Sequence, residues 1–165
     1  MPILDPHSLE IISRSVEQTR RVGMRLGGML ETGDILCLVG DLGSGKTTFV
    51  QGLAAGWGSL DQVSSPSFVL VNIYRYPSEG QLFHLDAYRL DGVLDAQVLD
   101  IGSMLEKGPL VVEWADHIED ALPKENLWVN LRWVNPNQRD LTFNARGYHY
   151  ETMLAEFRKR VYGGM

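Results

Sequence analysis

The residues with the clearest chemical meaning form a glycine-rich stretch that ends in a lysine and two threonines. Residues 40–48 read Gly-Asp-Leu-Gly-Ser-Gly-Lys-Thr-Thr, which satisfies the pattern G-x-x-x-x-G-K-[ST] of the phosphate-binding loops in ATP- and GTP-using proteins. Glycines let the backbone pass close to phosphate oxygens because no Cβ stands in the way. Backbone amides and the N-terminal end of a following helix then attract the phosphates. The stretch therefore predicts a nucleotide-binding site.

Two side chains of this loop have specific predicted roles. Lys46 reaches the β- and γ-phosphates in loops of this kind, and the hydroxyl of Thr47 binds Mg²⁺. The flanking sequence supports the motif, since the apolar residues 35–39 predict a buried parallel strand and residues 49–55 predict a helix. We therefore expect ATP and Mg²⁺ as cofactors. The loop residues expected to bind ATP are Asp41, Leu42, Gly43, Ser44, Gly45, Lys46, Thr47 and Thr48.

Hydrolysis of a bound nucleotide also needs a metal clamp and a group that positions water. Two carboxylates follow apolar runs, Asp86 at the end of residues 83–86 and Glu113 at the end of residues 110–113. Open α/β sheets bind their ligands at the C-terminal ends of strands. We therefore expect both carboxylates near the phosphates, each as a candidate second contact for Mg²⁺. A structural salt bridge is the alternative role for either residue.

Three further features near these motifs have two readings each. The residues Ser65, Pro66 and Ser67 lie in a polar connection, either a switch that covers the γ-phosphate or a plain turn. Trp114 follows Glu113 and forms either core packing or a wall of the nucleotide site. His84 is expected to be packed or capping rather than catalytic.

Composition limits the classes of function. The 165 residues have the length of one domain, 1–165, and the sequence holds no apolar run near 18 residues and no secretory signal. The single cysteine, Cys37, excludes an internal disulfide and is expected to be a buried apolar residue, which suits a cytoplasmic location. The net charge of −6 argues against independent binding to nucleic acid. Two basic clusters are either solvated helix faces or a docking surface for a partner: Arg14, Arg20, Arg21 and Arg25, and Arg158, Lys159 and Arg160.

The remaining elements follow from hydrophobic periodicity and turn residues. We predict helices over residues 8–31, 93–105 and 148–162, and strands over 68–76, 81–88, 109–114, 127–134 and 141–145. Residues 77–80 are expected to join two of these strands as a hairpin. Hairpins mixed with strand–helix units predict an α/β fold, a P-loop NTPase-like three-layer sandwich with a mixed, mostly parallel sheet covered by helices.

Four motifs in this order resemble one family, the TsaE (YjeE) ATPases of bacterial tRNA threonylcarbamoyladenosine biosynthesis. They are the extended loop over residues 40–49, Val-Ser-Ser-Pro-Ser-Phe over 63–68, His-Leu-Asp-Ala-Tyr-Arg-Leu over 84–90, and Val-Glu-Trp over 112–114. The similarity spans residues 8–147, and the C-terminal helix, residues 148–165, matches no motif of the family.

The resemblance implies a weak ATPase that drives turnover of a partner complex, TsaD with TsaB, and does not itself modify tRNA. That complex transfers a threonylcarbamoyl group to adenosine 37 of tRNA, so contact with tRNA is expected only through the partners. The resemblance also implies that Lys46 contacts phosphate, that Thr47 and Glu113 hold Mg²⁺, that Asp86 acts on the attacking water or on the metal, and that Trp114 lies beside the nucleotide. The alternatives are a small-molecule P-loop kinase and a nucleotide-dependent binding switch.

Overall fold

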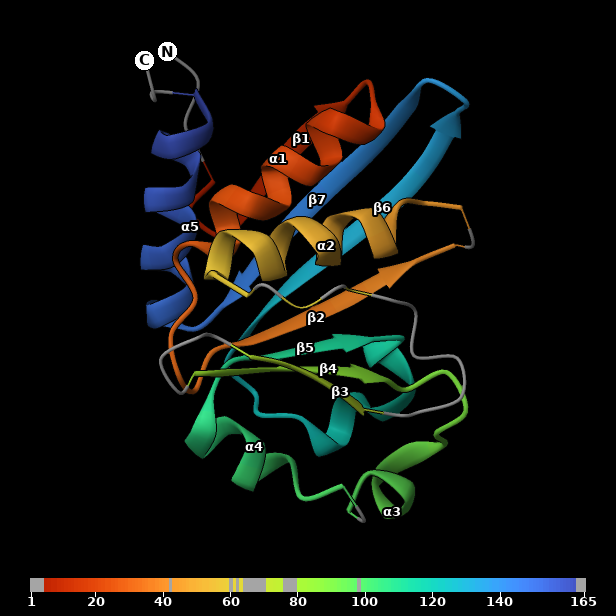
Figure 1. Ribbon diagram of the computed structural model, residues 1–165, viewed down its shortest axis with the longest axis vertical. Coiled ribbons are helices and arrows are strands. Elements are labelled where there is room, and N and C mark those ends of the chain that lie inside the picture. Colours follow the sequence, from red (N-terminus) through yellow and green to blue (C-terminus); the bar gives the residue numbers. More distant parts are fainter. Residues whose placement is uncertain are drawn as a thin grey trace.

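A mixed β-sheet runs through the molecule, with helices packed against it (Figure 1). The computed structural model describes residues 5–41, 43–59, 61, 63, 71–75, 80–97 and 99–162. The strands are β1 (Ser8–Ser13), β2 (Ile35–Gly40), β3 (Val71–Arg75), β4 (Gln81–Asp86), β5 (Leu110–Glu113), β6 (Asn126–Asn135) and β7 (Gln138–Arg146). The helices are α1 (Val16–Gly27), α2 (Lys46–Trp57), α3 (Gly92–Gln97), α4 (Ile101–Lys107), the 3₁₀ helix η1 (Ala115–Ala121) and α5 (Tyr148–Tyr162).

The strand order is β1-β7-β6-β2-β5-β4-β3. The four strands in the middle of this order, β6, β2, β5 and β4, are parallel to one another, whereas β1, β7 and β3 pair antiparallel. The antiparallel β6–β7 pair follows from its short connection, residues 136–137, because only antiparallel strands can be joined so tightly. The predicted mixed α/β sheet is confirmed, but it is not mostly parallel: of the six pairings between the described strands, three are parallel and three are antiparallel.

Strand β2 lies in the middle of the sheet and is buried on both faces. Leu36, Cys37 and Leu38 are fully buried, as expected for a strand with neighbours on both sides and cover above and below. Burial raises the pKa of the Cys37 thiol far above its ordinary value, so this cysteine is an apolar core residue. The phosphate-binding loop therefore follows a strand whose first four residues are buried.

Helices α1 and α2 cross one face of the sheet together (Figure 1). Their backbones touch because each helix places glycines four residues apart at the contact. A Cβ on Gly27 would lie 2.1 Å from the carbonyl oxygen of Leu53, and one on Gly56 would lie 2.0 Å from that of Met24. Glycines that lower helix propensity in isolation are therefore required by the packing.

The predicted helix over residues 8–31 is wrong in its first part. Residues Ser8–Ser13 form strand β1, which pairs with β7, and Leu9, Ile11 and Ser13 are its buried positions. Their alternation has the period of a strand, which the longer helical pattern concealed. Helix α1 starts only after Ser15, whose side chain accepts a hydrogen bond from the Gln18 amide.

Two other predicted elements differ in their extent. The helical segment predicted over residues 93–105 is divided into α3 and α4, and Asp100 between them has a left-handed φ of 52°. Strand β3 accounts for residues 71–75 of the strand predicted over 68–76, and the rest of that prediction lies outside the described residues. Pairing of β3 with β4 confirms the antiparallel hairpin.

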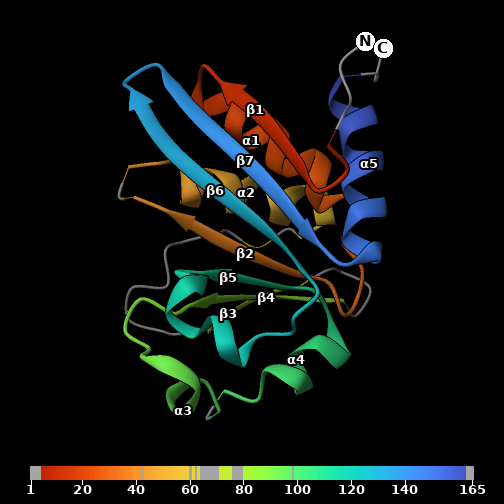
Figure 2. The same ribbon diagram turned by 180° about the vertical axis from the view of Figure 1, so that it is seen from behind.

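On the face of the sheet seen from behind, η1 lies near β2 and β5, and no described helix covers β1, β7 and β6 on this face (Figure 2). Helices thus lie on both faces of the sheet, with the second layer over its β5–β4 side. Among the described helices, none has the length and apolar character needed to cross a membrane.

Candidate nucleotide-binding site

The glycine-rich loop connects the end of β2 to the start of α2, and its glycines have conformational reasons to be there. Gly43 has φ 78° and Gly45 has φ 100°, a left-handed region that side chains with a Cβ rarely adopt. A Cβ on Gly40 would approach the Leu131 carbonyl oxygen of the neighbouring strand to 2.5 Å. Gly45 precedes α2 without any side-chain cap, so the first turn of the helix keeps free amides for an anion.

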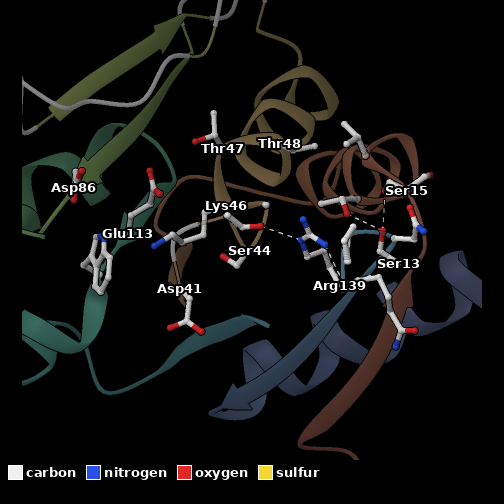
Figure 3. A pocket seen from close by; sticks show the side chains of 18 of the residues that line it. Ser13, Ser15, Asp41, Ser44, Lys46, Thr47, Thr48, Asp86, Glu113 and Arg139 are labelled. Carbon is white, nitrogen blue, oxygen red and sulfur yellow. Dashed lines mark hydrogen bonds between the residues drawn. The ribbon is translucent and has the colours of Figure 1, made fainter. Parts of the chain in front are cut away.

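A cavity of about 730 Å³ opens over this loop (Figure 3). Its volume falls within the range of small-molecule sites. The predicted site residues that line it are Asp41, Gly43, Ser44, Gly45, Lys46, Thr47, Thr48, Asp86, Glu113 and Trp114. The other predicted residues, Leu42 of the loop and the switch residues Ser65, Pro66 and Ser67, lie outside the described residues.

Lys46 lies at the centre of the site and is almost fully buried. Its Nζ donates a hydrogen bond to the Gly40 carbonyl oxygen at 2.7 Å and lies 4.0 Å from the centre of the Trp114 ring. Burial lowers the pKa of Lys46, and the nearby carboxylates of Glu113 and Asp86 partly oppose this shift. A buried ammonium group at the centre of the cavity is placed to bind an added phosphate.

The two predicted carboxylates come from adjacent parallel strands. Asp86 at the end of β4 is in register with Glu113 at the end of β5, so both reach the cavity from the same edge of the sheet. Asp86 accepts a hydrogen bond from the Tyr88 amide at 2.9 Å. Burial raises the pKa of the Asp86 carboxyl, and the Glu113 carboxylate adds to this effect. The structure thus brings together carboxylates that the sequence places 27 residues apart.

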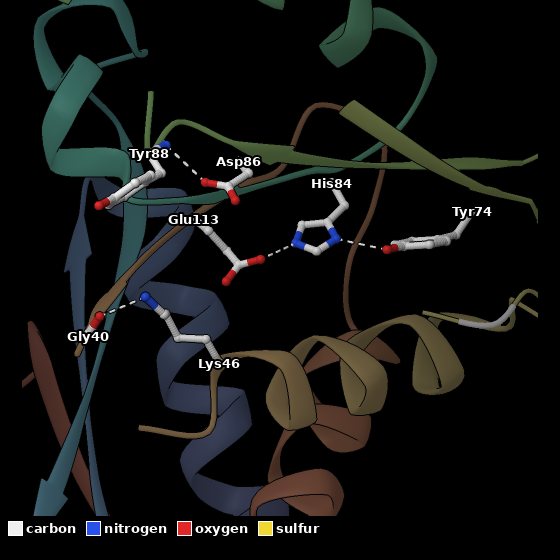
Figure 4. Close-up of polar contacts among 7 residues, drawn as sticks. All are labelled: Gly40, Lys46, Tyr74, His84, Asp86, Tyr88 and Glu113. Atoms are coloured by element: carbon white, nitrogen blue, oxygen red, sulfur yellow. Dashed lines mark hydrogen bonds and ion pairs between the residues drawn. The ribbon is translucent and has the colours of Figure 1, made fainter. Parts of the chain in front are cut away.

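His84 contacts Glu113 on the side opposite Lys46 (Figure 4). Its Nε2 lies 2.6 Å from Glu113 Oε2, and its Nδ1 lies 2.8 Å from the Tyr74 hydroxyl. All three side chains are buried. The expectation that His84 is packed is confirmed, but its contact with Glu113 was missed. The sequence held one signal that His84 belongs near the site. His84 and Asp86 are two residues apart on one strand, so their side chains lie on the same face of the sheet.

Trp114 combines the two roles considered for it. It is partly buried and it lines the cavity. Its φ of 57° is left-handed, an uncommon conformation for a bulky residue that clusters at functional sites. Its ring packs against Tyr88, with centroids 5.0 Å apart, and against His117, with centroids 5.5 Å apart.

A second wall of the cavity comes from segments that sequence reasoning did not assign to the site. They are the start of α1 with the end of β1 before it, and the turn between β6 and β7. Arg139 at this turn donates from Nε to the Gly43 carbonyl oxygen at 3.0 Å and so ties the turn to the loop. No local motif marks these residues, because 96 positions separate Arg139 from Gly43. The lining residues of this wall are Ser13, Ser15, Val16, Thr19, Pro136, Asn137, Gln138 and Arg139.

The donor set fits a nucleotide with Mg²⁺. The hydroxyl of Ser44 is buried in the loop and has no hydrogen-bond partner among the described residues, so an incoming acceptor would satisfy it. The described residues contain no group of three or more His, Cys, Asp or Glu that could hold a metal. Mg²⁺ at nucleotide sites takes only one or two protein carboxylates and completes its shell with phosphate oxygens and water. Thr47, Asp86 and Glu113 supply oxygens of this kind in one cavity.

The sheet order, the loop between β2 and α2, and the carboxylates at the ends of β4 and β5 define a P-loop NTPase-like α/β protein. A family model described as threonylcarbamoyl adenosine biosynthesis protein TsaE matches residues 13–141. The chain belongs to the TsaE family.

Relatives of known name agree with this assignment. The tRNA threonylcarbamoyladenosine biosynthesis protein TsaE of Bacillus subtilis is 35% identical over 85% of this chain and 87% of its own length. The protein of the same name from Treponema pallidum is 35% identical over 81% of this chain and 98% of its own length. The crystal structure of YdiB from Bacillus subtilis has a TM-score of 0.78 at 30% identity and covers 93% of this chain and 96% of its own.

Proposed function

We propose that this chain binds ATP with Mg²⁺ and hydrolyses it weakly, as a cytoplasmic component of the machinery for tRNA threonylcarbamoyladenosine. One observation carries the proposal: the phosphate-binding loop, Lys46 and two carboxylates from adjacent strands line one cavity. The names of the TsaE relatives support the assignment to tRNA threonylcarbamoyladenosine biosynthesis.

The side chains suggest how the phosphates are held. The free amides at the start of α2 and the ammonium of Lys46 would bind the β- and γ-phosphates. Thr47 and Glu113 would hold Mg²⁺, which neutralises charge on the phosphates and orients them. Asp86, with its raised pKa, lies beside Glu113 where it can orient the attacking water or contact the metal through water.

The second wall of the cavity suggests where the nucleoside lies. The loop and Lys46 separate the carboxylates from the start of α1 and the β6–β7 turn (Figure 3). With the γ-phosphate on the carboxylate side, the ribose and base would extend toward Ser15, Val16 and Asn137. Val16 is 60% exposed and offers an apolar surface to a base.

The proposed role does not include transfer of the threonylcarbamoyl group, which we assign to partner proteins. We propose that ATP hydrolysis drives turnover of TsaD with TsaB and that tRNA is reached only through these proteins, because the chain has a net charge of −6. The two basic clusters are neighbours in the fold, since Arg25 donates to the Arg160 carbonyl oxygen at 3.0 Å. Arg158 donates to the Ser8 carbonyl oxygen at 2.6 Å. These contacts are structural, while Arg14 and Arg21 stay exposed and available to an acidic partner.

Reconstitution tests the proposal. Purified TsaD, TsaB and tRNA are combined with ATP and a preformed activated threonylcarbamoyl donor, with and without this chain, and modified tRNA is counted per TsaD. We expect repeated turnover only with the chain, and a single round when a slowly hydrolysed ATP analogue occupies it. The Glu113→Ala variant should behave like omission of the chain. Full multiple-turnover modification without the chain would refute the proposed process.

A further inference from the structure

A buried hydrogen-bonded chain leads away from Glu113 into the sheet. Glu113, His84 and Tyr74 lie on β5, β4 and β3, three strands that are consecutive in the sheet. His84 is 1% exposed and Tyr74 is 3% exposed. The nucleotide-binding role proposed above assigns no part to either His84 or Tyr74.

The direction of the hydrogen bonds follows from the groups involved. A carboxylate only accepts hydrogen bonds, so Nε2 of His84 donates to Glu113 Oε2. In the singly protonated imidazole Nδ1 is then an acceptor, and the Tyr74 hydroxyl donates to it. Every polar atom on the line from Tyr74 to Glu113 is satisfied by this assignment.

The hydrogen bonds from Tyr74 to His84 and from His84 to Glu113 fix one carboxylate oxygen of Glu113 and leave the other facing the cavity. Oε2 of Glu113 is tied to the imidazole, so Oε1 is turned away from it, on the side of Lys46 and α2 (Figure 4). Without this tie the carboxylate could rotate toward the Lys46 ammonium, whose positive charge attracts it. A Lys46–Glu113 pair would occupy both groups that the phosphates and the metal need.

We propose that His84 and Tyr74 are positioning residues that hold the Glu113 carboxylate in the orientation that binds Mg²⁺. This inference rests on the proposed function of the site. Removing a group that orients a metal ligand typically lowers the metal affinity by about 10–100-fold. The rings of Tyr74 and His84 also contact each other at a tilt of 39°, with centroids 5.7 Å apart, which restricts the imidazole further.

Two substitutions of His84 separate positioning from packing. The side-chain amide of glutamine can take the place of Nε2, so His84→Gln keeps a donor for Glu113. Asparagine is shorter and takes the place of Nδ1, so His84→Asn keeps a partner for Tyr74 and loses the donor to Glu113. Both variants leave a similar buried amide, and thermal unfolding checks that each is folded.

The measurement is the affinity of the 165-residue chain for a fluorescent ADP, with and without Mg²⁺. We expect Mg²⁺ to tighten ADP binding by the wild type, and the half-saturating Mg²⁺ concentration to rise about 10-fold or more in His84→Asn. In His84→Gln the half-saturating Mg²⁺ concentration should return most of the way to the wild-type value. Binding of ADP in EDTA should stay the same in all three proteins, because the loop amides remain intact.

Tyr74→Phe gives a milder test that removes one hydroxyl. We expect about a fivefold rise in the half-saturating Mg²⁺ concentration, which corresponds to one hydrogen bond of about 1 kcal/mol. The matched control is Tyr150→Phe, which removes a buried hydroxyl that accepts from the Ile35 amide at 3.0 Å, at the opposite end of β2. This control should be destabilised without any change in the Mg²⁺ requirement. If His84→Asn does not fold, the comparison of Tyr74→Phe with Tyr150→Phe tests the positioning role.

The outcomes are distinguishable from failure of the proposed function. If the wild type shows no effect of Mg²⁺ on ADP binding, the metal site of the proposed function is refuted and the positioning role with it. If the wild type shows the effect and His84→Asn or Tyr74→Phe retains it fully, the metal site stands and the positioning role is overturned. Equal losses in His84→Gln and His84→Asn would also overturn it, since packing alone would then explain the histidine.

Discussion

Replacing Gly27 by alanine tests whether α1 and α2 must touch through their backbones. The added Cβ would lie 2.1 Å from the Leu53 carbonyl oxygen and 2.8 Å from its carbonyl carbon. Both atoms belong to the backbone, so no rotamer change can relieve the contact. The helices would have to separate by about 0.9 Å to restore even a 3.0 Å contact. Overpacking of this kind costs about 1–3 kcal/mol.

The helix propensity of alanine offsets part of this cost, because alanine is favoured over glycine by about 1 kcal/mol in a helix. Since the contact is at the severe end, we expect a net loss of about 2 kcal/mol in the free energy of unfolding. For a chain of this length, the midpoint of thermal unfolding should fall by about 4–8 °C. Urea unfolding followed by circular dichroism measures the free energy directly.

The neighbouring Gly28 provides the matched control. It has φ −65° at the end of the same helix, and its nearest contact to an added Cβ is an ordinary 3.6 Å. Gly28→Ala should therefore be neutral or slightly stabilising. Gly102→Ala in α4, where an added Cβ meets nothing within 4 Å, should stabilise by up to about 1 kcal/mol. If Gly27→Ala is as stable as Gly28→Ala, the close backbone contact does not govern the packing of α1 on α2.

Three further predictions concern the site. Lys46→Ala should lower the ATP turnover rate by about 10²–10³-fold; a loss below fivefold in a steady-state assay would contradict its role at the phosphates. Asp86→Asn should stabilise the nucleotide-free protein at neutral pH, because burial raises the Asp86 pKa and the folded state disfavours the charged form. This gain should be absent below the usual pKa of 3.8, grow as pH rises above it and level off above the raised pKa, and an equal effect at all pH values would refute it. Arg139→Ala should weaken ADP binding about fivefold by freeing the Gly43 carbonyl group, whereas Arg132→Ala, which removes the ion pair with Asp140 on the same hairpin, should leave ADP binding unchanged in the same titration.

The local chemistry of the site could be predicted from the sequence. The phosphate-binding loop could be recognised from the sequence, because its glycines, Lys46 and Thr47 occur at fixed short spacings. Asp86 and Glu113 followed from the rule that ligands bind where parallel strands end, and the structure places both at one cavity. The mixed sheet and the β3–β4 hairpin also followed from hydrophobic pattern and turn residues.

Other features depended on partners that are distant in sequence. Residues 8–13 form a strand because β7, more than 120 positions later, offers an edge for pairing. Gly27 has a reason only when α2 lies against α1. The β6–β7 turn reaches the phosphate loop through Arg139, and His84 finds Glu113 across a strand register. A sequence specifies short-range chemistry through the spacing of residues, but these contacts exist only once the sheet order has brought remote backbones within hydrogen-bonding distance.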